Sequence, residues 1–175
     1  MCSTKPPNLF SPDAAQSVTG AVAAVAELSF FADVGRCDDG VFDELASVAS
    51  SWLIATVHFR EGDAAGTLQC SVPRDLARAL LDAFTGRDPA DPEPEADALF
   101  DLVGELSNMI CGTWLTRMAT AQTFTLSRPV VELSAERPAD TLPGGSAAAR
   151  LIVNDMPLAV SVCAASDGAP AAVGF

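Results

Sequence analysis

Residues 97–118 (DALFDLVGELSNMICGTWLTRM) carry acidic and amide side chains at a spacing that suits chemistry on one side of a helix. Four residues share that side because they stand at i, i+4, i+7 and i+11: Asp101, Glu105, Asn108 and Gly112. Glu105 and Asn108 are three residues apart, so their side chains project together. The pair combines a charged acceptor with a neutral amide that donates and accepts hydrogen bonds. We therefore interpret this side of the helix as a docking face.

The opposite side of the same helix is apolar and wide enough to seat the helix on a core: Leu99, Leu102, Val103, Leu106, Met109, Ile110 and Trp114. Gly104 and Gly112 interrupt the helix, where each costs about 1 kcal/mol relative to alanine. Two glycines kept at that cost indicate that another group comes close. The plainer alternative is that Glu105 and Asn108 are solvated side chains of an exposed surface.

The composition describes a folded globular protein and narrows its possible partners. A chain of 175 residues suits one domain, and 49% hydrophobic with 19% charged residues argues against disorder. The net charge of −13 argues against binding nucleic acid by phosphate neutralisation and against an anionic membrane surface. The apolar run at 21–26 is too short to cross a membrane, so we expect no membrane insertion.

Cysteine and histidine usage restricts the chemistry further. The five cysteines are scattered without a CxxC pair, which suits a reducing cytosol: Cys2, Cys37, Cys70, Cys111 and Cys163. His58 is the only histidine, and its place in an alternating strand favours a hydrogen-bonded sheet residue over a catalyst. There is no P-loop and no GxGxxG motif after a strand. The sequence therefore predicts a cytoplasmic protein with no metal and no cofactor of its own.

The order of periodic segments predicts an α+β fold. We expect a flexible arm at 1–12, one domain at 13–165 and a flexible tail at 166–175. The predicted helices are 13–34 (Val18, Ala21, Val22, Val25 and Leu28 near one face), 73–84 (Leu76, Leu80 and Phe84 inward, Gly86 as the stop) and the central helix, capped by Asp97.

The alternating segments supply the strands. Residues 51–59 and 67–72 form a predicted hairpin, 123–127 and 130–133 flank Pro129, and 150–154 with 158–163 form a final hairpin. Residues 38–40, 87–95 and 135–148 are predicted connectors and loops. The sum is about three long helices against an antiparallel or mixed sheet of five or six strands.

The string DLVGELSN followed by Pro129 resembles the signature of the CheC/CheX/FliY chemotaxis phosphatases: Asp or Ser, three residues, Glu, two residues, Asn and a distant Pro. Asp101, Glu105 and Asn108 match its spacing. The resemblance implies a fold of two pseudo-symmetric halves, and the single motif is closest to the CheX-like members. Those members are commonly homodimers, so the resemblance also implies a dimer.

The resemblance further implies a function and a role for each residue. The implied activity is hydrolysis of the aspartyl phosphate of a CheY-like receiver domain, which carries its own Mg²⁺ and lysine. Asn108 would orient the attacking water, Glu105 would pair with the receiver's lysine, and Asp101 would support the helix face or a rim contact. The two glycines, Gly104 and Gly112, would let the receiver come close.

A second, shorter echo lies in the first helix. ELSF at 27–30 repeats ELSN at 105–108, with Glu27 answering Glu105 and Phe30 standing in place of Asn108. Duplication and chance both explain so short a match. By comparison with the family, the 27–30 copy would be inactive, and Glu27 has no assigned role.

Three function classes remain open on the sequence. The first is a response-regulator phosphatase. The second is a non-catalytic CheX-like module that binds a response regulator or a flagellar switch component. The third, a small-molecule sensor, is disfavoured because no polar cluster exists apart from the central helix.

Overall fold

The computed structural model describes residues 13–61, 64–88, 90–118, 123–136 and 147–165. Within these ranges the chain forms four helices, α1 (Asp13–Phe30), α2 (Asp39–Ser47), α3 (Arg74–Thr85) and α4 (Ala96–Met118). It also forms seven strands, β1 (Val34–Arg36), β2 (Trp52–Glu61), β3 (Ala64–Pro73), β4 (Thr125–Leu126), β5 (Val130–Ser134), β6 (Ala147–Val153) and β7 (Met156–Ala164). The predicted arm, the predicted tail and most of the predicted 135–148 loop lie outside the described residues.

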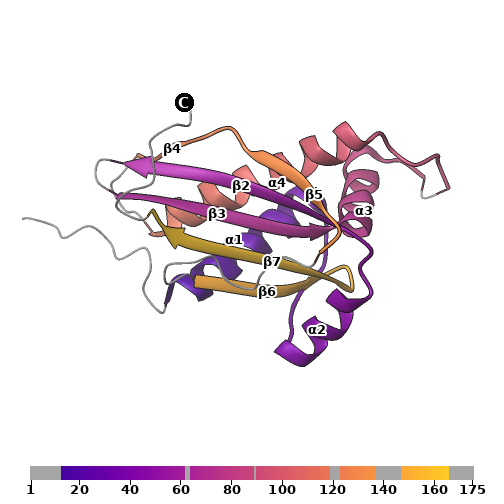
Figure 1. The fold of residues 1–175 in the computed structure, drawn as a ribbon, viewed down its shortest axis with the longest axis horizontal. Coiled ribbons are helices and arrows are strands. Elements are labelled where there is room, and N and C mark those ends of the chain that lie inside the picture. The colour runs from indigo at the N-terminus through magenta and orange to yellow at the C-terminus, as the bar shows by residue number, and fades with distance from the viewer. Residues whose placement is uncertain (1–12, 62–63, 89, 119–122, 137–146, 166–175) are drawn as a thin grey trace, which may run out of the picture.

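The strands form one antiparallel sheet in the order β1-β6-β7-β3-β2-β4, and β5 also pairs with β2. Figure 1 shows α1 and α4 side by side behind this sheet, with α3 at one end. The α+β prediction is confirmed. The sheet has more strands than predicted because the three-residue β1 carries too little periodicity to be recognised.

The pairing pattern divides the chain into two similar halves. The first half is α1, β1 and the β2–β3 hairpin, and the second is α4, β5 and the β6–β7 hairpin. The edge strand of each half pairs with the hairpin of the other, β1 with β6 and β5 with β2, and β3 joins β7 at the centre. The predicted pseudo-two-fold arrangement is therefore present in the topology.

The core lies between the sheet and the three long helices. Alternate side chains of the central strands are buried on the helix-facing side: Leu53, Ala55, Val57, Phe59, Leu68, Cys70, Val72, Leu158, Val160 and Val162. The Phe59 ring meets Trp114 of α4 edge-on, with the ring centroids 5.5 Å apart. This contact ties β2 to the carboxyl-terminal half of α4.

The first helix is shorter than predicted. It ends at Phe30, because Phe31 adopts a left-handed conformation (φ 53°) and the Ala32 amide donates to the Ala26 carbonyl. Leu28, predicted to face inward, is 79% exposed. Phe84 of α3, also predicted to face inward, is 61% exposed. Its ring lies beside that of the buried Phe30, with the ring centroids 5.7 Å apart.

The predicted loop at 38–40 is the start of α2. The Asp38 carboxylate caps this helix by accepting a hydrogen bond from the Val41 amide at 2.9 Å. Phe42 and Ala46, one turn apart, are buried against Trp52 on the sheet face opposite the main core. The same acidic and glycine residues that suggested a turn therefore open a helix.

Most of the other predicted elements agree with the structure, although the predicted strand at 123–127 is reduced to Thr125–Leu126. The β2–β3 hairpin and α3 are confirmed, and Gly86 ends α3 in a left-handed conformation with φ 68°. Asp97 lies in the first turn of α4 and is not its cap, because the helix already begins at Ala96. None of the described helices is both long and apolar enough to span a bilayer.

Gly66 generates the first prediction. A methyl group at this position would clash with the Phe59 ring and stand 2.6 Å from the Cys163 carbonyl oxygen, which belongs to the backbone of β7 and cannot move aside. We expect Gly66→Ala to lower the free energy of unfolding by about 1–3 kcal/mol, as overpacking does. Chemical denaturation measures this, with Gly35→Ala as the control, since nothing lies within 4 Å of a methyl group there. Equal effects at both glycines would contradict the prediction.

Candidate functional site

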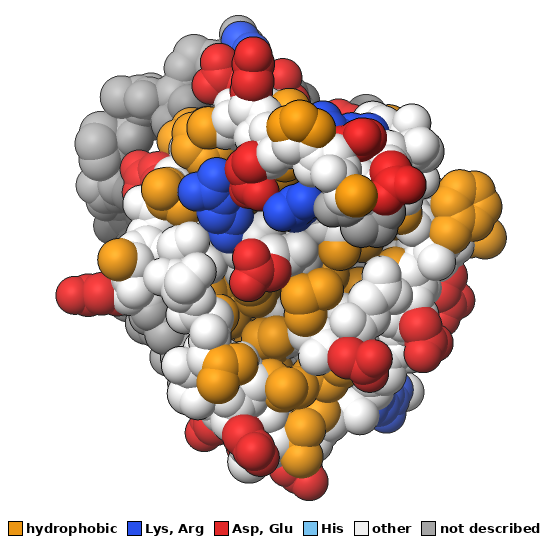
Figure 2. Space-filling model, turned by 90° about the vertical axis from the view of Figure 1, so that its right-hand side faces the viewer, with side chains coloured by type: hydrophobic (Ala, Val, Ile, Leu, Met, Phe, Trp, Pro, Cys, Tyr) orange, Lys and Arg blue, Asp and Glu red, His pale blue; other side chains and the backbone are white. Residues whose placement is uncertain are grey.

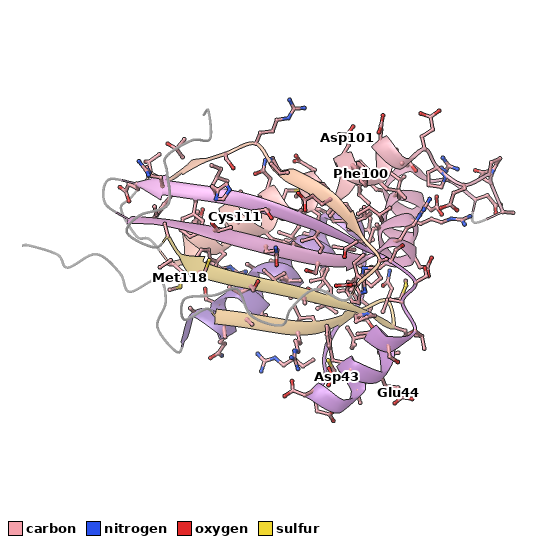
Figure 3. The ribbon with its side chains drawn as sticks, viewed as in Figure 1. Asp43, Glu44, Phe100, Asp101, Cys111 and Met118 are labelled. Carbon is pink, nitrogen blue, oxygen red and sulfur yellow. The ribbon has the colours of Figure 1, made fainter. Side chains whose placement is uncertain are left out.

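The polar side of α4 faces away from the core. Asp101 and Glu105 are exposed and Asn108 is half-buried, while the predicted apolar side is buried except for the partly buried Met109. In Figure 3 Asp101 lies at the rim of the molecule, whereas Cys111 of the same helix lies behind the strands. The predicted phase of the helix is therefore confirmed.

Ser107, next to Asn108 in the chain, lies on the core side of α4. Its buried hydroxyl donates to the Val103 carbonyl at 2.7 Å within α4. Burial raises the pKa of the Cys70 thiol on β3 to about 12, and a side-chain hydrogen bond with Ser107 acts in the opposite direction. A neutral thiol and a satisfied hydroxyl thus lie on the buried side of α4.

The second wall of the site is the segment between β4 and β5. Ser127, buried in this segment, accepts a hydrogen bond from the His58 amide at 3.0 Å, and its own amide donates to the His58 carbonyl at 2.8 Å. The His58 imidazole bonds with Thr67 at 2.9 Å, which confirms its interpretation as a satisfied sheet residue. The segment is therefore held on β2 by backbone contacts.

Gly104 brings this wall close to the helix. A methyl group at Gly104 would lie 3.5 Å from Pro129 and 3.6 Å from Val131, so these two residues occupy the space beside the glycine. Gly104 is itself buried. Within the described structure Pro129 and Val131 pack beside Gly104 in ordinary contact, and Gly104 also lines the depression described next, so its predicted role toward a partner stays a prediction.

A shallow depression of about 270 Å³ lies between α4 and this wall. Five of the residues that line it were predicted from the sequence: Asp101, Gly104, Glu105, Asn108 and Pro129. The other three were not predicted: Phe100, Arg128 and Val131. Gly112 is not among the lining residues, since it lines a neighbouring depression beside Phe124 and Leu126. No sequence pattern indicated Arg128, because its place in the depression depends on strand pairing.

The polar groups of the depression are not engaged with one another. The Asn108 side-chain oxygen is shielded from solvent and accepts no hydrogen bond from the described residues. A buried acceptor left unpaired costs about 1–3 kcal/mol, so the amide gains by turning toward a donor such as water. No ion pair links Asp101, Glu105 or Arg128 to a charged group within the described ranges.

The connector that precedes α4 is held by ion pairs with α3. Glu93 of the connector meets Arg74 at 3.3 Å and Arg78 at 2.8 Å, and Asp82 meets Arg87 at 3.3 Å. Figure 2, which faces this end of the molecule, shows positive and negative side chains interleaved above a band of hydrophobic ones. The acidic connector is thus anchored to arginines of its own chain.

The echo in α1 is out of phase with the motif in α4. Leu28 is exposed, whereas its sequence counterpart Leu106 is 1% exposed. The burial patterns instead match Val18, Val22 and Val25 with Leu99, Val103 and Leu106. This match sets Glu27 opposite Asn108, so the predicted equivalence of Glu27 with Glu105 is wrong.

The match that sets Glu27 opposite Asn108 places Ala24 opposite Glu105. The first half therefore has a carboxylate, Glu27, where α4 has the amide, and an alanine, Ala24, where α4 has the carboxylate. Among the described residues no group of three or more histidine, cysteine, aspartate or glutamate side chains is arranged to hold a metal ion.

Comparisons with known proteins agree with this fold. The family model for chemotaxis phosphatase CheX matches residues 53–148, more than half of the chain. The fold is similar to that of the chemotaxis protein CheX from Vibrio vulnificus (13% identity, TM-score 0.65, 86% of this chain and 95% of that chain). It is also similar to CheX from Desulfovibrio desulfuricans (18% identity, TM-score 0.63, 86% and 98%).

A third similar structure is the CheX–CheY–BeF3–Mg²⁺ complex from Borrelia burgdorferi (14% identity, TM-score 0.57, 86% of this chain and 97% of that chain). A comparison with curated protein sequences finds no match. At these identities the solved structures establish the fold, and the family model establishes the family.

The two glycines of α4 give a second prediction. Gly104→Leu forces a side chain into the space of Pro129 and Val131, so we expect it to lower the free energy of unfolding by about 1–3 kcal/mol. Gly112→Leu is the matched control, because nothing lies within 4 Å of a methyl group there and a helix former gains about 1 kcal/mol over glycine. Thermal or urea unfolding measures both. Destabilisation of the same size at the two positions would show that β5 is not packed on Gly104.

Proposed function

The chain belongs to the CheX chemotaxis phosphatase family, and we propose that it hydrolyses the aspartyl phosphate of a CheY-like response regulator. The observation that carries the proposal is the depression beside α4, where Glu105 and Asn108 present polar groups that no described residue engages. The similar structure of a CheX–CheY complex supports a receiver domain as the partner.

Asn108 suits the task of positioning water. An acyl phosphate is already activated, so its hydrolysis needs mainly a water molecule in line with the phosphorus, and positioning is most of phosphoryl-transfer catalysis. A neutral amide accepts a hydrogen bond from the water and donates one to a phosphoryl oxygen without repelling the phosphate. The unpaired oxygen of Asn108 leaves this amide free to turn toward the water.

Glu105 suits the task of docking. It lies one turn before Asn108 on the same side of α4 and is exposed. Its carboxylate would pair with the lysine of the receiver and so fix the register between the two proteins. Asp101, exposed one turn further toward the helix start, would make a rim contact, and Gly112 would leave room for the receiver.

Several finer expectations from the sequence and from the family resemblance stay predictions. They are a homodimer, a cytoplasmic location, and Mg²⁺ held by the receiver domain with no cofactor held by this chain. The single domain at 13–165 is likewise proposed, with the described elements running from α1 to β7.

Asn108→Ala tests the catalytic role. We expect the phosphorylated receiver to lose its label no faster with the variant than alone, because the water is no longer oriented. The fold should persist, since the Asn108 side-chain oxygen accepts no hydrogen bond that the substitution would remove, and the melting temperature checks this. Asn108→Asp, which keeps the shape but adds a negative charge, should be equally inactive. Hydrolysis by Asn108→Ala at the wild-type rate would refute the role.

A wild-type protein that binds the receiver without hastening loss of label would support the alternative, a non-catalytic CheX-like module. The assay uses a receiver phosphorylated by acetyl phosphate and separates the two functions directly. A fall in the melting temperature of Asn108→Ala by several degrees would show instead that the amide supports the core.

Glu105→Ala tests docking. Removing the carboxylate should raise KM and lower kcat, because the ion pair with the receiver both holds and orients it. Charge-assisted hydrogen bonds are worth about 1.5–3 kcal/mol, so kcat/KM should fall about 10- to 100-fold. Glu27→Ala is the matched control: it removes the same charge from an exposed position on α1 and should change neither constant. An unchanged kcat/KM for Glu105→Ala would exclude the docking role.

A further inference from the structure

Arg128 is the unexplained residue of the depression. It is exposed, and it is the one positively charged side chain among the described residues that line this depression. Asp101 and Glu105 line the same depression, yet neither approaches the guanidinium within ion-pair distance. The guanidinium is therefore available to a ligand.

The backbone that carries Arg128 is fixed on both sides. Ser127 before it is buried, bonded to His58 on β2, and donates its hydroxyl hydrogen to the Arg128 carbonyl at 3.2 Å. Pro129 after it restricts the Arg128 backbone to extended conformations and lies against Gly104. A side chain on a rigid backbone segment is positioned more precisely for binding than one on a flexible loop.

A positively charged side chain would offset the negative charge that gathers in the depression when a phosphoryl group binds there. Asp101 and Glu105 bring two negative charges to a place where the proposed substrate carries a doubly negative phosphoryl group. Asn108 is neutral and offsets none of this repulsion. A guanidinium presents several donors in a planar fork that fits phosphoryl oxygens, and arginines stabilise the charge that develops in phosphoryl transfer.

We propose that Arg128 binds the phosphoryl group of the phosphorylated partner and so distinguishes it from the unphosphorylated form. This inference rests on the proposed phosphatase function and adds a third residue to its site. In the reaction the water oxygen bonds to phosphorus, and the bond from phosphorus to the aspartyl oxygen breaks. The products are the carboxylate and dihydrogen phosphate, which keeps both hydrogens of the water. Arg128 contacts the phosphoryl oxygens throughout and transfers no proton.

Arg128→Gln tests this with two forms of one receiver domain. The first form carries beryllium fluoride and Mg²⁺, with beryllium fluoride standing for the phosphoryl group, and the second form carries Mg²⁺ alone. We expect the variant to bind the first form about tenfold or more weakly than wild type and the second form unchanged, since a hydrogen bond to a charged group is worth about 1.5–3 kcal/mol. Receiver hydrolysis should slow by a similar factor, and Arg128→Lys should restore part of both.

Arg36→Gln is the matched control. It removes the same charge from an exposed position on β1, at the opposite edge of the sheet, and should leave binding and hydrolysis unchanged. Wild-type behaviour of Arg128→Gln would overturn the inference while leaving the proposed function intact. Equal weakening toward both receiver forms would also overturn it, because the arginine would then contact a permanent acidic group. A wild-type protein that neither binds nor hydrolyses the phosphorylated receiver would overturn the proposed function and this inference together.

Discussion

Burial of the apolar side of α4 against the sheet is the interaction on which the site depends. An α-helix has 3.6 residues per turn. Burial of Leu99, Val103 and Leu106 in the core therefore makes Asp101 and Glu105 face outward. Ser107 makes this orientation specific. It is fully buried beside Asn108, and rotating the helix to bury the amide would pull the hydroxyl away from Cys70. The same packing that stabilises the fold thus sets the angle at which the amide meets a partner.

The helix alone does not make the site, because the other wall comes from strand exchange between the two halves. β5 belongs to the second half but pairs with β2 of the first, and this pairing carries Pro129 onto Gly104. Ser127 adds two hydrogen bonds to the backbone of His58 at the same junction. The first half repeats the arrangement with α1 and β1 but has Glu27 in place of the amide and Ala24 in place of the carboxylate. The topology therefore offers two places for a site, and the side chains equip one of them.

Periodicity predicted what depends on local pattern, and it missed what depends on tertiary contact. The outward placement of Asp101 and Glu105 followed from spacing alone. Arg128 could not be predicted, since it lies far along the chain and reaches the depression only through the pairing of β5 with β2. The match of ELSF to ELSN misled for a related reason. A short string carries no helix phase, and the exposure of Leu28 shows that the two copies face different ways.

The acidic surface bears on how such a site selects its partner. A net charge of −13 repels a negative phosphoryl group at long range, although salt at physiological strength confines this repulsion to about 8 Å. Selection must then come from short contacts inside that distance. Under the proposed function, the depression would supply them from three of its lining residues: the Glu105 carboxylate for a positive group of the partner, the Asn108 amide for water, and the Arg128 guanidinium for the phosphoryl oxygens. Each of these groups would contact a different chemical group. A partner that lacks the positive group or the phosphoryl group would therefore lose a contact and leave a polar group of the site unpaired.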